Sequence, residues 1–201
     1  NPSKIQYSLP GVYSVSLAVT NECGTTQATD KTFTIFPFSV GGTASANQTI
    51  CQGSTPAPIV LTGNTGTIQW QFSNTGGAPW TNIAGATGTT LTSAQMGSLT
   101  LTRHYQAVVT NGACPSVTSN MITITVNPAS IGGTASSNQT ICSGAIPNAL
   151  TLVGNTGTIQ WQSSTTGTSG WTNIAGETNT TLVLGVATST LYYQAIVTSG
   201  V

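Results

Sequence analysis

Apolar and polar residues alternate along several short stretches of this chain, which predicts β-strands rather than helices. Over Thr67–Ser73, Ile68 and Trp70 alternate with Thr and Gln residues, so one face of the strand is apolar and the other is polar. The same alternation recurs over residues 103–110 and 120–126. Turn residues separate such stretches at spacings of about 8–12 residues, which is typical of an all-β sandwich.

One nine-residue stretch, GNTGTIQWQ, occurs twice, at residues 63–71 and 154–162. The offset is 154 − 63 = 91 residues, and 32 of 48 positions are identical between residues 41–88 and 132–179. A period of this length is that of a small domain. We therefore predict tandem β-sandwiches, one complete over residues 38–128 and a second over residues 129–201 that is truncated before its last strand.

The first 37 residues predict only part of a domain. Alternation over Val12–Thr20 and Thr32–Phe36 indicates two strands with apolar side chains facing inward. Two strands do not form a stable domain in isolation. We expect residues 1–37 to be the C-terminal part of a β-domain.

Charged residues are rare, because the chain has three Lys or Arg and three Asp or Glu and a net charge of zero. This composition argues against electrostatic binding to nucleic acid. No apolar run approaches the ~20 residues of a membrane span, so we expect no membrane insertion in this segment. Sparse but regularly placed cysteines favour an oxidising compartment, and we expect an extracellular, cell-surface location.

Cys51 and Cys114 flank the complete repeat, and we predict that they form a disulfide. Closing their separation of 114 − 51 = 63 residues stabilises the fold by roughly 4 kcal/mol in the chain-entropy picture. Cys142 is expected to pair with a residue beyond Val201, and Cys23 with one before Asn1. The alternative is a metal site, but the chain has no C-x-x-C and one His, so we expect no metal and no cofactor.

Catalytic residue types are isolated in the sequence. His104 is the single histidine, and its counterpart in the second copy is Tyr192, so we expect His104 to face solvent. The acidic residues Glu22, Asp30 and Glu177 are scattered singly, which argues against both a carboxylate pair and a Ca²⁺ site. We therefore predict that the chain is not an enzyme.

Aromatic residues fall into two groups. Four lie on apolar faces of predicted strands and are expected in the cores: Trp70, Trp161, Tyr105 and Tyr193. Trp80 and Trp171 instead follow Gly-rich loops that differ between the copies. These two indoles either pack at the domain rim or are exposed and stack on a sugar ring.

Residues 7–24, YSLPGVYSVSLAVTNECG, resemble the C-terminal half of a PKD-type β-sandwich. The complete repeat resembles the immunoglobulin-like repeats of large type IX-secreted, gliding-motility-associated bacterial surface adhesins. The segments that carry this second resemblance are GGTAS-NQTIC (41–51), TIQWQ (67–71), WTNIAGAT (80–87), YQAVVTNGACPS (105–116) and ITITVNP (122–128).

The resemblance implies tandem immunoglobulin-like sandwiches after a PKD-like half-domain, in the stalk or filament of a secreted adhesin. The expected partners are neighbouring domains of the same long chain, and self-association into filaments is a further option because the closing strands carry no blocking charge. Two alternatives remain at this stage. One is a polysaccharide-binding module that uses Trp80 and Trp171, and the other is a non-catalytic spacer of a secreted enzyme.

Overall fold

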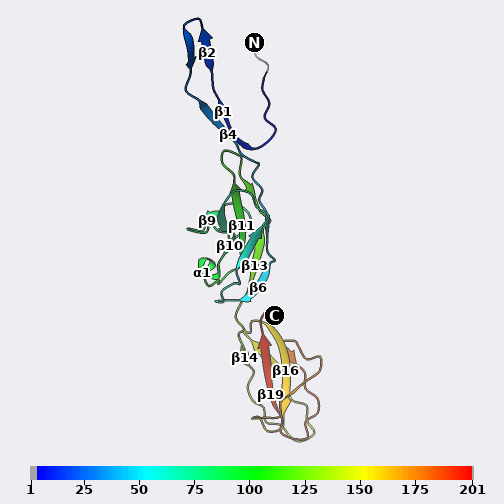
Figure 1. Ribbon diagram of the computed structural model, residues 1–201. Coiled ribbons are helices and arrows are strands. Elements are labelled where there is room, and N and C mark those ends of the chain that lie inside the picture. Colours follow the sequence, from blue (N-terminus) through cyan, green and yellow to red (C-terminus); the bar gives the residue numbers. More distant parts are fainter. Residues whose placement is uncertain (1–3, 201) are drawn as a thin grey trace. The chain divides into compact units, whose positions relative to one another are not determined.

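The computed structural model describes residues 4–200, and apart from one short helix the regular secondary structure of these residues consists of β-strands (Figure 1). The prediction of an all-β chain with tandem sandwiches is confirmed. The predicted segments begin at residue 1 and end at residue 201, and both of these positions lie outside the described residues. Packing divides the chain into two compact units, residues 4–48, 56–97 and 103–123, and residues 49–55, 98–102 and 124–200.

The second unit includes loops from one end of residues 38–128, and these loops bond to one another. The N–H of Gly53 donates to the carbonyl oxygen of Leu99 at 2.7 Å, and the N–H of Leu99 donates to Ser54 at 3.0 Å. The N–H of Gln52 donates to the carbonyl oxygen of Asn127 at 2.8 Å. These backbone bonds hold the loops together at that end of residues 38–128.

Residues 4–37 form two separate two-stranded ladders. β1 (Gly11–Val15) pairs with β4 (Lys31–Ile35), and β2 (Ala18–Asn21) pairs with β3 (Gly24–Gln27). The predicted inward face is wrong for most of its residues: Val15 is 51% exposed and Val19 is 60% exposed. A two-stranded ladder has no second layer to cover such side chains. Only a small aromatic cluster of Tyr7, Tyr13 and Phe33 forms, with ring centroids 4.4–5.5 Å apart.

The first repeat, residues 38–128, contains two sheets. One has the order β10-β7-β5, with bounds Thr90–Leu91, Ile59–Thr62 and Thr43–Ala44. The other has the order β6-β13-β11-β8-β9, with bounds Gln48–Cys51, Ile122–Asn127, Arg103–Thr110, Thr67–Ser73 and Thr81–Asn82, and β12 (Val117–Thr118) also pairs with β11. Fully buried side chains lie on both sheets, and Leu99 joins them from a loop. Those on the sheets are Trp70, Tyr105, Ile59, Leu61, Leu91, Ile122, Ile124 and Val109.

A single turn of helix, α1 (Ser93–Met96), follows β10 and was not predicted. Thr92 caps it, because the Thr92 hydroxyl accepts from the N–H of Gln95 and the Gln95 side chain accepts from the N–H of Thr92. This is a capping box. It turns Met96 inward, where that side chain is 5% exposed.

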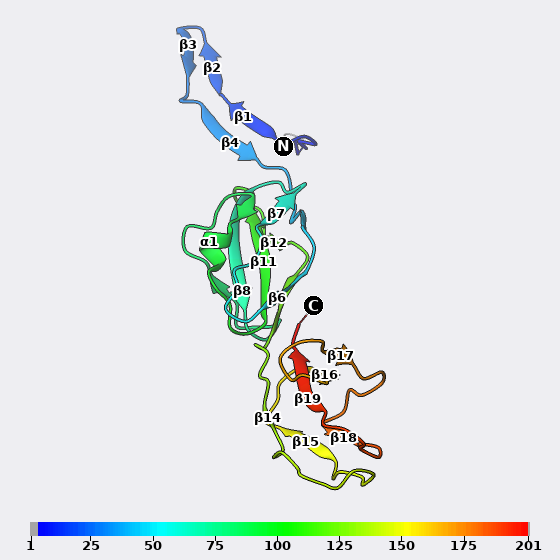
Figure 2. The ribbon, with the colours of Figure 1, turned by 90° about the horizontal axis from the view of Figure 1, so that it is seen from below.

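The second repeat contains a smaller pair of sheets (Figure 2). One has the order β14-β15-β18, with bounds Thr134–Ala135, Leu150–Val153 and Thr181–Leu182. The other has the order β17-β16-β19, with bounds Thr172–Asn173, Thr158–Ser164 and Tyr192–Thr198. Its core is formed by Leu152, Ile159, Trp161 and Leu182. The registers of β8 with β11 and of β16 with β19 are equivalent, since His104 faces Ser73 and Tyr192 faces Ser164.

Candidate functional site

Residues able to perform acid–base or metal chemistry are not gathered anywhere in residues 4–200. No group of three or more His, Cys, Asp or Glu side chains in this part of the chain could hold a metal ion. His104 is half-buried rather than facing solvent, and its Nδ1 lies 3.0 Å from the Thr123 hydroxyl. The Arg103 guanidinium lies 4.6 Å from the centre of the Phe72 ring, which is a cation–π contact. These interactions position β11 and do not assemble a reactive site.

Trp70 and Trp161 are both fully buried, at 0% exposure. The indole N–H of Trp70 donates to the carbonyl oxygen of Gly88 at 3.0 Å, and that of Trp161 donates to Asn179 at 2.9 Å. A buried indole needs such a partner because an unpaired N–H in the core is costly. The two indoles are therefore equivalent elements of the core and are not available to a ligand.

Tyr105 and Tyr193 occupy equivalent positions but differ in burial. Tyr105 is 0% exposed, and its hydroxyl has no hydrogen-bond partner among the described residues. Burial raises the pKa of the Tyr105 phenol above 10.0, and the nearby Arg103 charge acts in the opposite direction. Tyr193 is only half-buried.

Two buried serines that sequence reasoning missed shape the loops before Trp80 and Trp171. The Ser73 hydroxyl donates to the carbonyl oxygen of Gly77 at 2.5 Å and accepts from the N–H of Thr75. Ser164 repeats this arrangement with Ser169 and Thr166. The sequence signal for these serines was the S-x-T triplet that begins at the last residue of both β8 and β16. Ser and Thr hydroxyls stabilise turns through local hydrogen bonds to the backbone.

We call residues 74–79 and 165–170 the variable loops, because their sequences differ between the two copies although each loop is followed by a tryptophan. Each leads into an indole that is half-buried, Trp80 or Trp171. A small hollow of about 180 Å³ lies beside the first loop and is lined by Phe72, Ser73, Asn74, Thr75, Pro79 and Thr81. Trp80 is not among the residues that line this hollow.

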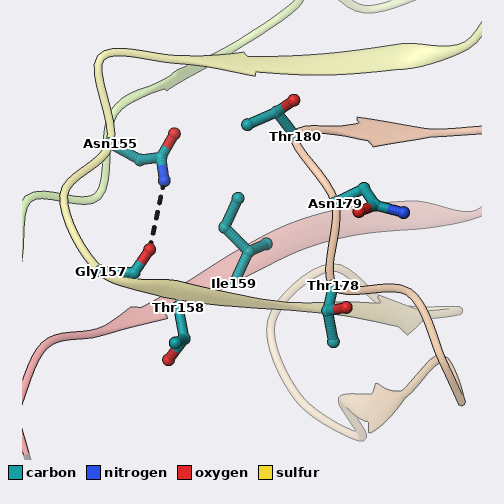
Figure 3. Close-up of a pocket in the computed structure, with 7 residues that line it drawn as sticks. All are labelled: Asn155, Gly157, Thr158, Ile159, Thr178, Asn179 and Thr180. Atoms are coloured by element: carbon teal, nitrogen blue, oxygen red, sulfur yellow. Dashed lines mark hydrogen bonds between the residues drawn. The ribbon is translucent and has the colours of Figure 1, made fainter.

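An open hollow of about 610 Å³ lies in the second repeat, lined by Asn155, Gly157, Thr158, Ile159, Thr178, Asn179 and Thr180. Figure 3 shows Ile159 projecting toward it, with the Asn155 amide donating to the carbonyl oxygen of Gly157 at 3.5 Å. Its lining is uncharged and carries hydroxyl and amide groups. Such a surface can hydrogen-bond a neutral ligand, but it offers no nucleophile with a base.

All four cysteines are free in the structure, so the predicted disulfide between Cys51 and Cys114 is not supported. The Cys114 thiol lies 3.4 Å from the carbonyl oxygen of Pro37 and is half-buried there. Cys51 ends β6 and is exposed. The expected partners of Cys23 and Cys142 lie outside the described residues.

No helix in residues 4–200 is long and apolar enough to cross a membrane. None of the curated proteins compared with this chain matches it. Among solved structures, the crystal structure of domains A168–A170 from titin is 14% identical, with a TM-score of 0.39. That match covers 94% of this chain, which spans only 64% of the titin structure.

The crystal structure of chicken CNTN1 FN1–FN3 domains is also 14% identical, with a TM-score of 0.29 over 94% of this chain and 70% of that one. A sequence family, described as Domain of unknown function (DUF8696), matches residues 40–128 and again residues 131–201. These two matches fall on the two β-sandwich repeats and together cover most of the chain. The chain therefore belongs to the DUF8696 family, with two consecutive copies of its domain.

Proposed function

We propose that these repeats are structural modules of an extracellular, cell-surface adhesin, where they form part of a stalk or filament. The observation that carries the proposal is that the two copies share their scaffold and differ in their loops. Trp70 and Trp161 make the same buried hydrogen bond. Gln69 and Gln160 each donate to the backbone of the following loop at 2.9 Å, to Ile83 and Ile174. A spacer needs a stable fold that can be repeated, and it does not need the same binding site in every copy.

Surface composition supports the same function. Only 3% of the residues are charged, so polar Thr, Ser, Asn and Gln side chains keep the modules in solution. A surface of this kind has little long-range attraction for charged ligands. The adhesin identity, type IX secretion and a role in gliding motility rest on the resemblance of the motifs and belong to the proposal.

Mechanical unfolding tests the structural role. Single chains are stretched by force spectroscopy, and the first repeat is expected to unfold in one event. Residues 38–128 comprise 91 residues, which at about 3.6 Å each release roughly 30 nm of chain. Gradual extension without a discrete event would contradict a load-bearing module. Surface location is tested separately with an antibody against residues 38–200 on intact cells, with a periplasmic protein as the control that must stay unlabelled.

A polysaccharide-binding module is the second candidate, and the half-burial of Trp80 and Trp171 favours it. An indole that is partly open to solvent can stack on a sugar ring, whereas Trp70 and Trp161 cannot. The test is a glycan array with the intact chain, the Trp80→Ala and Trp171→Ala variants, and Phe38→Ala as a control at a residue that is 85% exposed. Binding that is lost in the Trp variants and kept in the control would replace the spacer role with this one. The third hypothesis, a non-catalytic spacer of a secreted enzyme, has no separate observation in its favour.

A further inference from the structure

The segments that follow Trp80 and Trp171 are almost identical and differ at two positions. The first reads TNIAGATGTTL at residues 81–91, and the second reads TNIAGETNTTL at residues 172–182. Glu177 stands where the first repeat has Ala86, and Asn179 stands where it has Gly88. The second repeat therefore carries two polar side chains that the fold of the first repeat does without.

The change to asparagine creates an Asn-Thr-Thr triplet at residues 179–181. An asparagine that is followed two positions later by Ser or Thr is the acceptor pattern for N-linked glycosylation. Asn47 and Asn138 begin triplets of the same kind, but each of them has a serine two positions earlier. Only Asn179 combines the triplet with a carboxylate at that place, because Glu177 precedes it by two residues.

The Asn179 side chain is open to solvent. Asn179 lies in an exposed bend before β18, and in Figure 3 its side chain points away from the Ile159 side chain. The Asn179 amide makes no hydrogen bond within residues 4–200, whereas the Asn47 amide oxygen accepts from the N–H of Thr123 at 2.8 Å. The amide nitrogen of Asn179 is therefore free to react.

The first repeat shows that this position is open by virtue of the loop itself. Gly88 is exposed as well, and a Cβ built there would meet only backbone atoms of Thr90, at 3.9 and 4.0 Å. These are ordinary contact distances. A side chain at this place projects outward in both copies, so a bulky group attached to it does not disturb the sandwich.

The backbone around Asn179 is anchored to the core. The carbonyl oxygen of Asn179 accepts from the Trp161 indole N–H at 2.9 Å, and the carbonyl oxygen of Glu177 accepts from the Trp161 backbone N–H at 3.0 Å. Thr181 is exposed and begins β18, which is an edge strand of its sheet. The side chains of Glu177, Asn179 and Thr181 thus belong to one accessible stretch whose backbone the core holds.

We propose that Asn179 is an N-glycosylation site, and that Glu177 and Thr181 are the flanking residues that a membrane-bound transferase recognises. The co-reactant is an oligosaccharide linked to a lipid through a diphosphate. Asn179 Nδ2 forms a bond to the anomeric carbon of the first sugar, and the bond from that carbon to the diphosphate oxygen breaks. The electron pair of the broken bond leaves with the lipid diphosphate, the amide gives up one proton to the solvent, and nothing is oxidised or reduced.

Charge and surface chemistry agree with this assignment. Glu177 is the only charged residue in the sequence of residues 129–201, so its carboxylate has no cation within the repeat and is available to one in the transferase. An attached glycan is bulky and solubilising, which suits a surface that has almost no charge of its own. The inference rests on export of the chain, as in the proposed function, and does not need the stalk or adhesin role.

Mass spectrometry of the intact chain tests the site. The chain is expressed in its source cells with an added export signal, and the exported fraction is cleaved with chymotrypsin after Trp171 and Leu182. We expect the resulting peptide, residues 172–182, to carry added sugar mass that electron-transfer fragmentation places on Asn179. Residues 81–91, which are released by the same cleavage after Trp80 and Leu91, are the matched control and are expected to be unmodified.

Four single variants separate recognition from folding. Asn179→Gln and Thr181→Ala are expected to lose the sugar mass, and Thr181→Ser is expected to keep it because the hydroxyl is retained. Glu177→Gln keeps the size of the side chain and removes its charge, so we expect a several-fold lower occupancy. Thermal melting of each variant shows that it is folded.

A double variant transfers the acceptor to the first repeat. Gly88 has no positive φ, so asparagine is acceptable there, and Ala86→Glu with Gly88→Asn is expected to add sugar mass to residues 81–91. An unmodified peptide 172–182 in the exported chain, sugar on a threonine instead of Asn179, or full occupancy in Thr181→Ala would each overturn the proposal. Full occupancy in Glu177→Gln would overturn the role of Glu177. Absence of surface labelling in cells without the added signal would overturn the proposed location instead.

Discussion

The pair of variants Gly41→Ala and Gly132→Ala tests whether the two copies of GGTAS lie in different environments. Both glycines open the same pentapeptide. A Cβ at Gly41 would come within 2.6 Å of the Thr118 carbonyl carbon, whereas a Cβ at Gly132 meets nothing within 4 Å among residues 4–200. Neither residue has a positive φ, so alanine is acceptable to the backbone at both sites and only the steric contact differs.

The size of the effect follows from the contact at Gly41. Overpacking against backbone, which cannot rotate away as a side chain can, costs about 1–3 kcal/mol. For a domain of this size, a loss of about 2 kcal/mol lowers the Tm by roughly 8–16 °C. At Gly132 the change from Gly to Ala is expected to be neutral or to stabilise by about 0.4–1 kcal/mol, because it reduces the entropy of the unfolded chain.

Calorimetry of the intact chain resolves this prediction, supported by hydrogen exchange over residues 67–73 and 158–164 as separate reporters of the two repeats. We expect Gly41→Ala to speed exchange in the first reporter and leave the second unchanged. Gly132→Ala is expected to change neither. Equal destabilisation by both variants, or none by either, would refute the contact between Gly41 and Thr118.

Three further predictions concern single side chains. Trp161→Ala is expected to lower the free energy of unfolding of the second repeat by about 3–5 kcal/mol. Trp80→Ala is expected to lower the free energy of unfolding of the first repeat by less than half of that amount. Both values are measured by urea denaturation. Tyr105→Phe removes a buried hydroxyl that has no partner in the described chain, so we expect unchanged stability or a gain of up to about 1 kcal/mol. Because the folded-state pKa of Tyr105 is raised above 10.0, the folded state holds this proton more tightly. The parent is therefore expected to lose stability as the pH rises above 10.0, and Tyr105→Phe to lose less in pH-dependent melting. Thiol titration with Ellman's reagent under native conditions is expected to modify Cys114 more slowly than Cys51, since Cys114 is half-buried and Cys51 is exposed; equal rates would contradict these exposures.

Much of the fold is readable from local alternation. β8 and β11 have the predicted bounds, Thr67–Ser73 and Arg103–Thr110. Each strand buries one face, so apolar residues occur at every second position of its sequence. Trp70 and Trp161 lie in the cores for the same reason. The helix α1 was missed because its signal is a four-residue capping pattern inside a chain otherwise rich in Thr and Gly.

Contacts between distant segments were not readable in this way. The inward residues of Val12–Thr20 are exposed, since alternation specifies a face but not whether a second layer covers it. His104 bonds to Thr123, and Cys114 lies against Pro37, through chain paths that no local pattern encodes. The bond predicted between Cys51 and Cys114 is not supported by the structure, in which both thiols are free, and sequence spacing does not specify where two thiols lie.

The sequence by itself determined that this protein is a tandem of β-sandwiches with neutral surfaces and a repeated tryptophan core. Those properties depend on residue type and local periodicity, and both copies carry the same pattern over residues 41–88 and 132–179. The tertiary structure alone decided which distant segments meet. Thr123 lies against His104 and Pro37 lies against Cys114, because these contacts join residues far apart in the chain that no local periodicity relates.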